Sequence, residues 1–259
     1  MRERYPREDL AVLTERVENA LTETIKEGFE HDLNEDAITY NLLISVRKLL
    51  RSARVEDLSD ILRINCEAYK YRGTPEHNFG DIGVVINIHF NDKDSLEGVG
   101  FIEAKIRNKG KGNYASFEAA QVDRIYSNAP HSFLLLYDYA PAQLECKNID
   151  IPFRRFCKAC YSGLDKGTHA IVVPMNIVLT KEKLNQQIYR FAIPLSYQLC
   201  FRYMFGFDLN FARHPLKSAI EFAMSRPTRY IMVITVIHGD RQVERQLFPN
   251  DNLYARVED

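Results

Sequence analysis

The stretch Gly80-Asp81-Ile82-Gly83-Val84-Val85-Ile86-Asn87-Ile88-His89-Phe90 is the most informative for the fold, because apolar residues fill every even position from 82 to 90. Successive side chains of a strand point to opposite faces, so this spacing predicts a β-strand over residues 82–90 with one apolar face. Residues 91–95 are polar and favour a turn. Residues 99–107 return to a strand pattern, and we expect the two strands to pair as an antiparallel hairpin.

On the N-terminal side of this hairpin, apolar spacings of three and four predict an amphipathic helix over residues 8–29 and a second to about residue 52, with Asn34 as its N-cap. A weaker helix is predicted over residues 55–69. The remaining elements expected are helices over 115–126, 153–161, 196–205 and 217–224, and strands over 132–137, 169–179 and 229–237. This mixed order indicates an α/β (α+β) fold, with a mixed sheet flanked by helices.

Composition limits the possible functions. The chain has 259 residues and a net charge of 34 − 35 = −1, so it is not a protein that coats nucleic acid by bulk charge. Any phosphate-binding surface must therefore be local. The hydrophobic fraction of 46% is typical of an ordered globular protein, and we expect a single domain spanning residues 1–259.

The cysteines and the apolar runs point to a cytoplasmic protein without a membrane span. Five cysteines at uneven spacing indicate reduced thiols, and the lone Cys157-Lys158-Ala159-Cys160 motif favours two helical thiols over a zinc site. The charged N-terminal segment does not resemble a secretory signal. No apolar run approaches the length of about 18 residues that a membrane helix needs.

The second strand carries the chemistry, in the sequence Phe101-Ile102-Glu103-Ala104-Lys105-Ile106-Arg107. Glu103 and Lys105 are two residues apart and therefore share one face of the strand. The hairpin would bring Asp81 beside them. Two carboxylates supply the oxygen ligands that Mg²⁺ prefers, and a lysine can orient or deprotonate a water molecule. A second Glu-x-Lys, Glu145-Cys146-Lys147, has no strand pattern around it, so the tripeptide alone carries no information.

Gly80-Asp81-Ile82 followed by Glu103-Ala104-Lys105 resembles the PD-(D/E)xK nuclease superfamily, which includes type II restriction enzymes and Holliday-junction resolvases. The resemblance covers about residues 35–138, and Gly80 stands where the superfamily usually has proline. It implies a restriction-endonuclease-like core over about residues 30–180. Residues 181–259 would then be a C-terminal extension for dimerisation or substrate reading.

The resemblance also implies roles for individual residues. Asp81, Glu103 and the Ala104 carbonyl would hold Mg²⁺, for which Mn²⁺ can substitute, and Lys105 would be the catalytic lysine. Glu35 lies on the core-facing stripe of its helix and would assist a second metal ion or the attacking water. The alternative for Glu35 is a charge that stabilises the helix dipole, with Asp36 as the neighbouring candidate.

Two further groups of residues are candidates around this site. Gln121 shares one side of its predicted helix with Phe117 and Arg124, and would contact water or the scissile phosphate; a half-exposed helix surface is the alternative. The cations expected to hold DNA phosphates are Arg107, Lys109, Lys111 and Arg124, although a solvated loop also explains the cluster at 107–111.

The function that follows is Mg²⁺-dependent hydrolysis of DNA phosphodiester bonds. An endonuclease of a restriction or anti-phage defence system is the expected setting, acting as a homodimer or as a subunit of a defence complex. The alternative is a non-catalytic nucleic-acid-binding or scaffolding subunit with a nuclease-like fold. An RNA-directed nuclease is a third possibility. The aromatic stretch 197–205 fits a core or subunit interface better than a platform for stacked bases.

Overall fold

The structure is a computed structural model that describes residues 9–57, 60–73, 78–110, 113–114, 119–142, 167–180, 184–212, 215, 228–240 and 249–258. The strands in these ranges form one nine-stranded mixed sheet. They are β1 (Ala53–Asp57), β2 (Asp60–Tyr71), β3 (Ile82–His89), β4 (Ser95–Ile106), β5 (Phe133–Ala142), β6 (Thr168–Pro174), β7 (Ile193–Pro194), β8 (Tyr230–His238) and β9 (Tyr254–Arg256).

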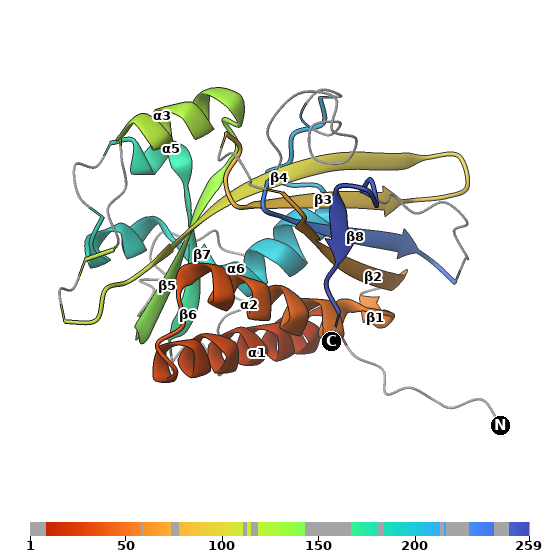
Figure 1. The fold of residues 1–259 in the computed structure, drawn as a ribbon. Coiled ribbons are helices and arrows are strands. Elements are labelled where there is room, and N and C mark those ends of the chain that lie inside the picture. The colour runs from red at the N-terminus through yellow and green to blue at the C-terminus, as the bar shows by residue number, and fades with distance from the viewer. Residues whose placement is uncertain are drawn as a thin grey trace.

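Helices flank the sheet (Figure 1). The two long ones are α1 (Leu10–Glu30) and α2 (Glu35–Leu50), and α3 (Ala119–Asn128) lies near the site described below. The shorter helical segments are α5 (Met175–Val178), η3 (Gln186–Phe191), α6 (Leu195–Tyr197), η4 (Gln198–Arg202) and η5 (Tyr203–Phe205). An α/β fold with a mixed sheet is therefore confirmed.

The sheet order is β1-β2-β8-β3-β4-β5-β6-β7, with β9 on β2. β3 and β4 pair antiparallel, with Ile82 opposite Ile102, which confirms the predicted hairpin. β8, from the C-terminal part of the chain, lies between β2 and β3 and runs parallel to β3. The predicted final strand is thus an interior strand of the sheet.

One face of the sheet packs against α1 and α2. The even positions of β3, from Ile82 to Ile88, are buried in this core, as the period-two pattern predicts. The opposite face has two apolar clusters. One joins β5 and β6 to α3, α5 and η3, and the other surrounds Val85 and Phe101. Glu103 and Lys105 belong to this second face, because they alternate with the inward-facing Ile102 and Ala104.

The helix predicted over residues 55–69 is wrong, because the segment forms β1 and β2. Its apolar residues Val55, Leu58, Leu62, Cys66 and Tyr69 have helical spacing. The same segment also has an apolar residue at every second position from Leu62 to Ala68, which is the period of a strand. Pairing with β8 on one side selects the strand.

Apart from residues 175–179, which were predicted as part of a strand, the other predicted elements agree with the structure where it describes them. The strand expected over 169–179 ends at Pro174 and is followed by α5. Residues 196–205 are helical, and Leu199, Cys200, Tyr203 and Met204 are buried in the main core. The helices expected over 153–161 and 217–224 lie outside the described residues, as do the Cys157–Cys160 motif and Glu145-Cys146-Lys147. In the described part of the chain, no helix has the length and apolarity to cross a membrane.

Candidate active site

The candidate site lies where β3 and β4 separate. β4 pairs with β3 as far as Ile102 and then continues to Ile106. Two carboxylates bind the backbone of this last part of β4. Asp81 Oδ2 accepts a hydrogen bond from the Ala104 N–H, and Glu35 Oε2 accepts one from the Ile106 N–H, both at 2.9 Å. Beyond Ile102, the edge of β4 is thus occupied by two side chains instead of by β3. They are Asp81, immediately before β3, and Glu35, on α2.

The Ala104 carbonyl belongs to the same edge. The N–H and C=O of one strand residue point toward the same neighbouring strand. Because the Ala104 N–H donates to Asp81, its carbonyl oxygen also lies on the side of β4 that faces Asp81.

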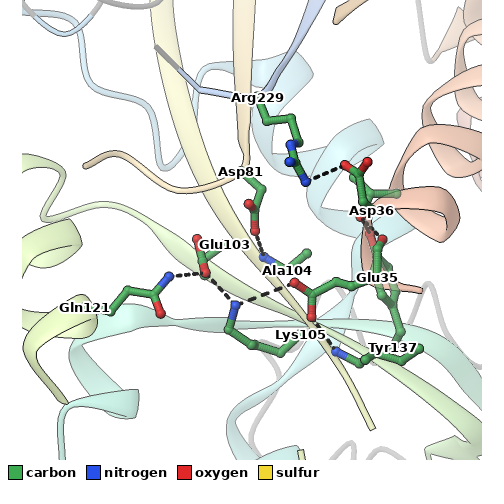
Figure 2. A network of polar contacts seen from close by, with 11 residues as sticks. Glu35, Asp36, Asp81, Glu103, Ala104, Lys105, Gln121, Tyr137 and Arg229 are labelled. Carbon is green, nitrogen blue, oxygen red and sulfur yellow. Dashed lines mark hydrogen bonds and ion pairs between the residues drawn. The ribbon is translucent and has the colours of Figure 1, made fainter. Parts of the chain in front are cut away.

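Glu103 contacts two other side chains of the site (Figure 2). Its Oε1 accepts hydrogen bonds from Lys105 Nζ and from Gln121 Nε2, both at 2.6 Å. Lys105 Nζ also lies 3.6 Å from Glu35 Oε1. Glu103 is only 1% exposed, so these charge-assisted contacts are made away from bulk water. The structure therefore brings Asp81, Glu103, Lys105, Gln121 and Glu35 together, as the sequence predicts.

Burial and mutual charge set the protonation of the site. Burial alone would lower the pKa of the Lys105 ammonium, but the carboxylates of Glu103 and Glu35 outweigh it and raise this pKa above its usual value. Burial raises the pKa of the Glu35 carboxyl, and the Lys105 charge opposes this shift only in part. Lys105 is therefore held as a cation. The Glu35 carboxyl group takes up a proton more readily than an exposed glutamate does.

Local sequence explains why Glu35 points into the site. Asn34 caps α2, because its side chain accepts a hydrogen bond from the Ala37 N–H at 2.9 Å, so Glu35 is the first helical residue. One turn later, the Thr39 hydroxyl bonds to the Glu35 carbonyl and to the buried Tyr137 hydroxyl on β5. The first turn of α2 is thus anchored to the strand beside Lys105.

Gly80 has a structural role that proline could not fill. Its φ is +99°, and a Cβ atom there would lie 2.8 Å from the Ile102 carbonyl oxygen and 3.1 Å from the Glu103 nitrogen. Proline restricts φ to about −65°. The glycine before Asp81 therefore lets the chain pass close to β4, in a backbone conformation that proline could not adopt.

Replacing Gly80 by alanine is expected to destabilise the fold by about 3 kcal/mol, from strain in φ together with displacement of the β4 backbone. Gly239→Ala is the matched control, because Gly239 has φ +85° and no atom of the described residues lies within 4 Å of the position that its Cβ would take. That control should cost about 1 kcal/mol. Urea unfolding of both variants tests this, and equal losses would contradict a close approach at Gly80.

The donor set suits a divalent cation such as Mg²⁺. Two carboxylates and a backbone carbonyl are hard oxygen ligands, and a dication would offset the repulsion between Asp81 and Glu103. Figure 2 shows these two side chains beside Ala104, one from the residue before β3 and the other from β4. In the described ranges, no group of three His, Cys, Asp or Glu side chains has a metal-binding arrangement. The predicted set has two such side chains, and its third ligand is a backbone oxygen.

Three of the four predicted phosphate-binding cations lie within the described residues, and their environments differ. Arg107 is 8% exposed, its Nη1 contacts both oxygens of Asp138 at 2.8 and 2.9 Å, and its guanidinium lies over the Tyr139 ring. The Arg107 charge is therefore engaged by Asp138 rather than presented to solvent. Lys109 pairs with Asp32 at the exposed α1–α2 connection, and Arg124 is exposed on α3. Lys111 lies outside the described residues, as does Phe117.

A second polar group lies beside Asp81 and was not predicted from the sequence. Its centre is Asp36, whose Oδ1 accepts a hydrogen bond from the Tyr230 hydroxyl at 2.6 Å and pairs with Arg229 Nη1 at 2.8 Å. Lys70 Nζ lies 3.7 Å from the other oxygen of Asp36. Arg229 immediately precedes β8, much as Asp81 immediately precedes β3, but no sequence signal indicated that these two strands are neighbours.

Comparisons of this chain with family models, with curated proteins and with solved structures found no match.

Proposed function

We propose that the protein is a divalent-metal-dependent nuclease that hydrolyses DNA phosphodiester bonds, with a site similar to that of the PD-(D/E)xK superfamily. The observation that carries the proposal is the convergence of Asp81, Glu103 and Lys105 at the point where β3 and β4 separate. Asp81, Glu103 and the Ala104 carbonyl would hold Mg²⁺ or Mn²⁺. When bound there, the ion would polarise the scissile phosphate and stabilise negative charge in the transition state.

The chain's own residues supply the rest of the chemistry. Lys105 is held as an ammonium group, and its N–H donors can stabilise the charge that develops on the phosphate oxygens. Gln121 holds Glu103 from α3 and can donate its second amide hydrogen to water or phosphate. Glu35 can take the proton of the attacking water, because burial raises the pKa of its carboxyl. Water attacks phosphorus and gives a proton to Glu35, the bond between phosphorus and the leaving oxygen breaks, and the leaving oxygen takes a proton from solvent.

The biological setting proposed is restriction or anti-phage defence in the cytoplasm. This part rests on analogy with the resembled superfamily. A homodimer is proposed because two copies related by a two-fold axis would cut the two strands of a duplex most simply.

Metal removal tests the proposed function. The purified protein should cleave plasmid, linear duplex or single-stranded DNA in Mg²⁺, and cleavage should stop in EDTA and return when Mg²⁺ is added in excess. Competition with RNA of the same sequence tests the preference for DNA. Binding of DNA without cleavage in Mg²⁺ or Mn²⁺ would instead support the alternative of a non-catalytic nucleic-acid-binding subunit.

A further inference from the structure

Two cations that the proposed mechanism does not use lie at the same end of the sheet as Asp81. Lys70 is near the end of β2, and Arg229 immediately precedes β8. Their backbones are neighbours across the sheet, since the Tyr230 N–H donates to the Asp81 carbonyl and the Tyr71 N–H donates to the Arg229 carbonyl, both at 2.9 Å. The order across the sheet is therefore Asp81, then Arg229, then Lys70.

Both cations are held in place by the same acid. Asp36 contacts Arg229 at 2.8 Å through one oxygen and Lys70 at 3.7 Å through the other. The Lys70 ammonium also lies over the rings of Tyr40 and Tyr230, with 5.2 and 5.6 Å to the ring centroids. These contacts restrain two long side chains that would otherwise lose conformational entropy when they bind a ligand.

The group retains a positive charge and access to solvent. Two cations share one carboxylate, so the sum over Lys70, Arg229 and Asp36 is +1. The side chains of Lys70 and Arg229 are 43% and 34% exposed, compared with 9% for Arg107. A guanidinium has five N–H donors, and the ion pair with Asp36 is made at Nη1. The arrangement suits an anion that approaches from solvent.

The position of Lys70 and Arg229 beside Asp81 indicates that their ligand is another phosphate of the DNA that is cleaved at Asp81. Figure 2 shows Arg229 and Asp36 on the side of Asp81 that faces away from Gln121. Neighbouring strands are about 4.8 Å apart, so Lys70 is about 10 Å across the sheet from Asp81. Phosphates of one DNA strand advance about 3.4 Å each along the duplex axis. A backbone with its scissile phosphate at Asp81 can therefore reach Arg229 and Lys70 within a few nucleotides.

We propose that Lys70 and Arg229, positioned by Asp36, bind the DNA backbone phosphates that flank the scissile phosphate on the β8 and β2 side. The inference rests on the proposed nuclease function. In this proposal, two half-exposed cations take the phosphate-binding role that the sequence predicted for Arg107, which is buried. The proposal also defines the direction in which the DNA strand leaves the site.

The test is the salt dependence of DNA binding. A fluorescein-labelled duplex is titrated with the full chain at several salt concentrations, in EDTA and again in Ca²⁺, and log Kd is plotted against log salt. Each phosphate contact contributes about 0.9 to this slope. The double variant Lys70→Gln/Arg229→Gln should reduce the slope by about 2 and weaken binding at 0.1 M salt by roughly 50-fold.

Two further variants make the result specific. Arg63→Gln is the matched control, because Arg63 is a half-exposed arginine on β2 that pairs with Asp240 at the opposite end of that strand. It should leave the slope unchanged. The charge-retaining variant Lys70→Arg/Arg229→Lys should keep most of the slope. This variant, together with a thermal unfolding curve for each variant, separates the loss of charge from misfolding.

The outcomes separate this inference from the proposed function. A slope and affinity equal to wild type in the folded double glutamine variant would overturn the phosphate contacts, even if Mg²⁺-dependent cleavage is observed. The predicted loss of slope would support them, even if no variant cleaves DNA. If wild-type protein binds no DNA in either buffer, the inference is overturned together with the proposed substrate.

Discussion

Lys105→Ala is expected to lower the rate of DNA cleavage in Mg²⁺ by at least about 100-fold, the usual cost of removing one donor that stabilises transition-state charge. Lys105 is the cation that contacts both Glu103 and Glu35, at 2.6 and 3.6 Å. Its loss removes a charge that would face the scissile phosphate. Single-turnover cleavage of a labelled duplex measures the effect without the contribution of product release.

The matched control for this variant is Lys48→Ala. Lys48 is exposed on α2, about 20 Å along the helix from Glu35. The Lys48→Ala variant should therefore cleave DNA at the wild-type rate. DNA binding by Lys105→Ala in EDTA should stay within a few-fold of wild type, which shows that the fold is retained. A folded Lys105→Ala protein that cleaves as fast as Lys48→Ala would remove Lys105 from the mechanism.

The largest loss of stability is expected from Asp138→Ala, at about 3–5 kcal/mol, because it leaves the Arg107 charge buried without its carboxylate. Asp138 is completely buried and accepts hydrogen bonds from Arg107, from the Tyr189 hydroxyl and from the Ala140 N–H. Since Arg107 follows Lys105 by two residues, at the end of β4, this ion pair also supports the strand that carries the site. For a chain of this size, the melting temperature should fall by roughly 10 °C.

Asp240→Ala is the control for the buried pair. Asp240 likewise forms ion pairs, with Arg54 and Arg63, but it is exposed, so its removal should cost less than about 1 kcal/mol. The double variant Arg107→Met/Asp138→Leu should recover much of the stability lost in Asp138→Ala, since an apolar pair can replace a buried ion pair. Calorimetry of the variants checks both expectations. A cost for Asp138→Ala no larger than for Asp240→Ala would contradict a buried ion pair.

The hairpin and the core of the site could be predicted from the sequence because they depend on local patterns. The period-two stretch from Ile82 to Ile88 determines which side chains face the main core, and the Glu103–Lys105 spacing puts both of those side chains on the other face. Phe90, the last apolar residue of the pattern, lies beyond β3 and is exposed. Glu35 was also predictable, because Asn34 signals the start of α2. These patterns need only the geometry of a single strand or a single helix.

The remaining features depend on contacts between distant segments. Nothing in the residues of β8 indicates that it inserts between β2 and β3, so the position of Arg229 beside Asp81 could not be predicted. The burial of Arg107 depends on Asp138 of β5, which lies 31 residues away in the sequence. The segment 55–69 satisfies helical and strand spacing together, and only its pairing with β8 selects the strand.

The proposed function depends above all on a divalent cation held by Asp81, Glu103 and the Ala104 carbonyl. A crystal of the protein soaked in Mn²⁺, with anomalous data collected from it, can locate such an ion. We expect one anomalous peak within coordination distance of a carboxylate oxygen of Asp81, a carboxylate oxygen of Glu103 and the carbonyl oxygen of Ala104. A soaked crystal without a peak among these three atoms, or with Mn²⁺ bound only elsewhere, would contradict the proposed metal site.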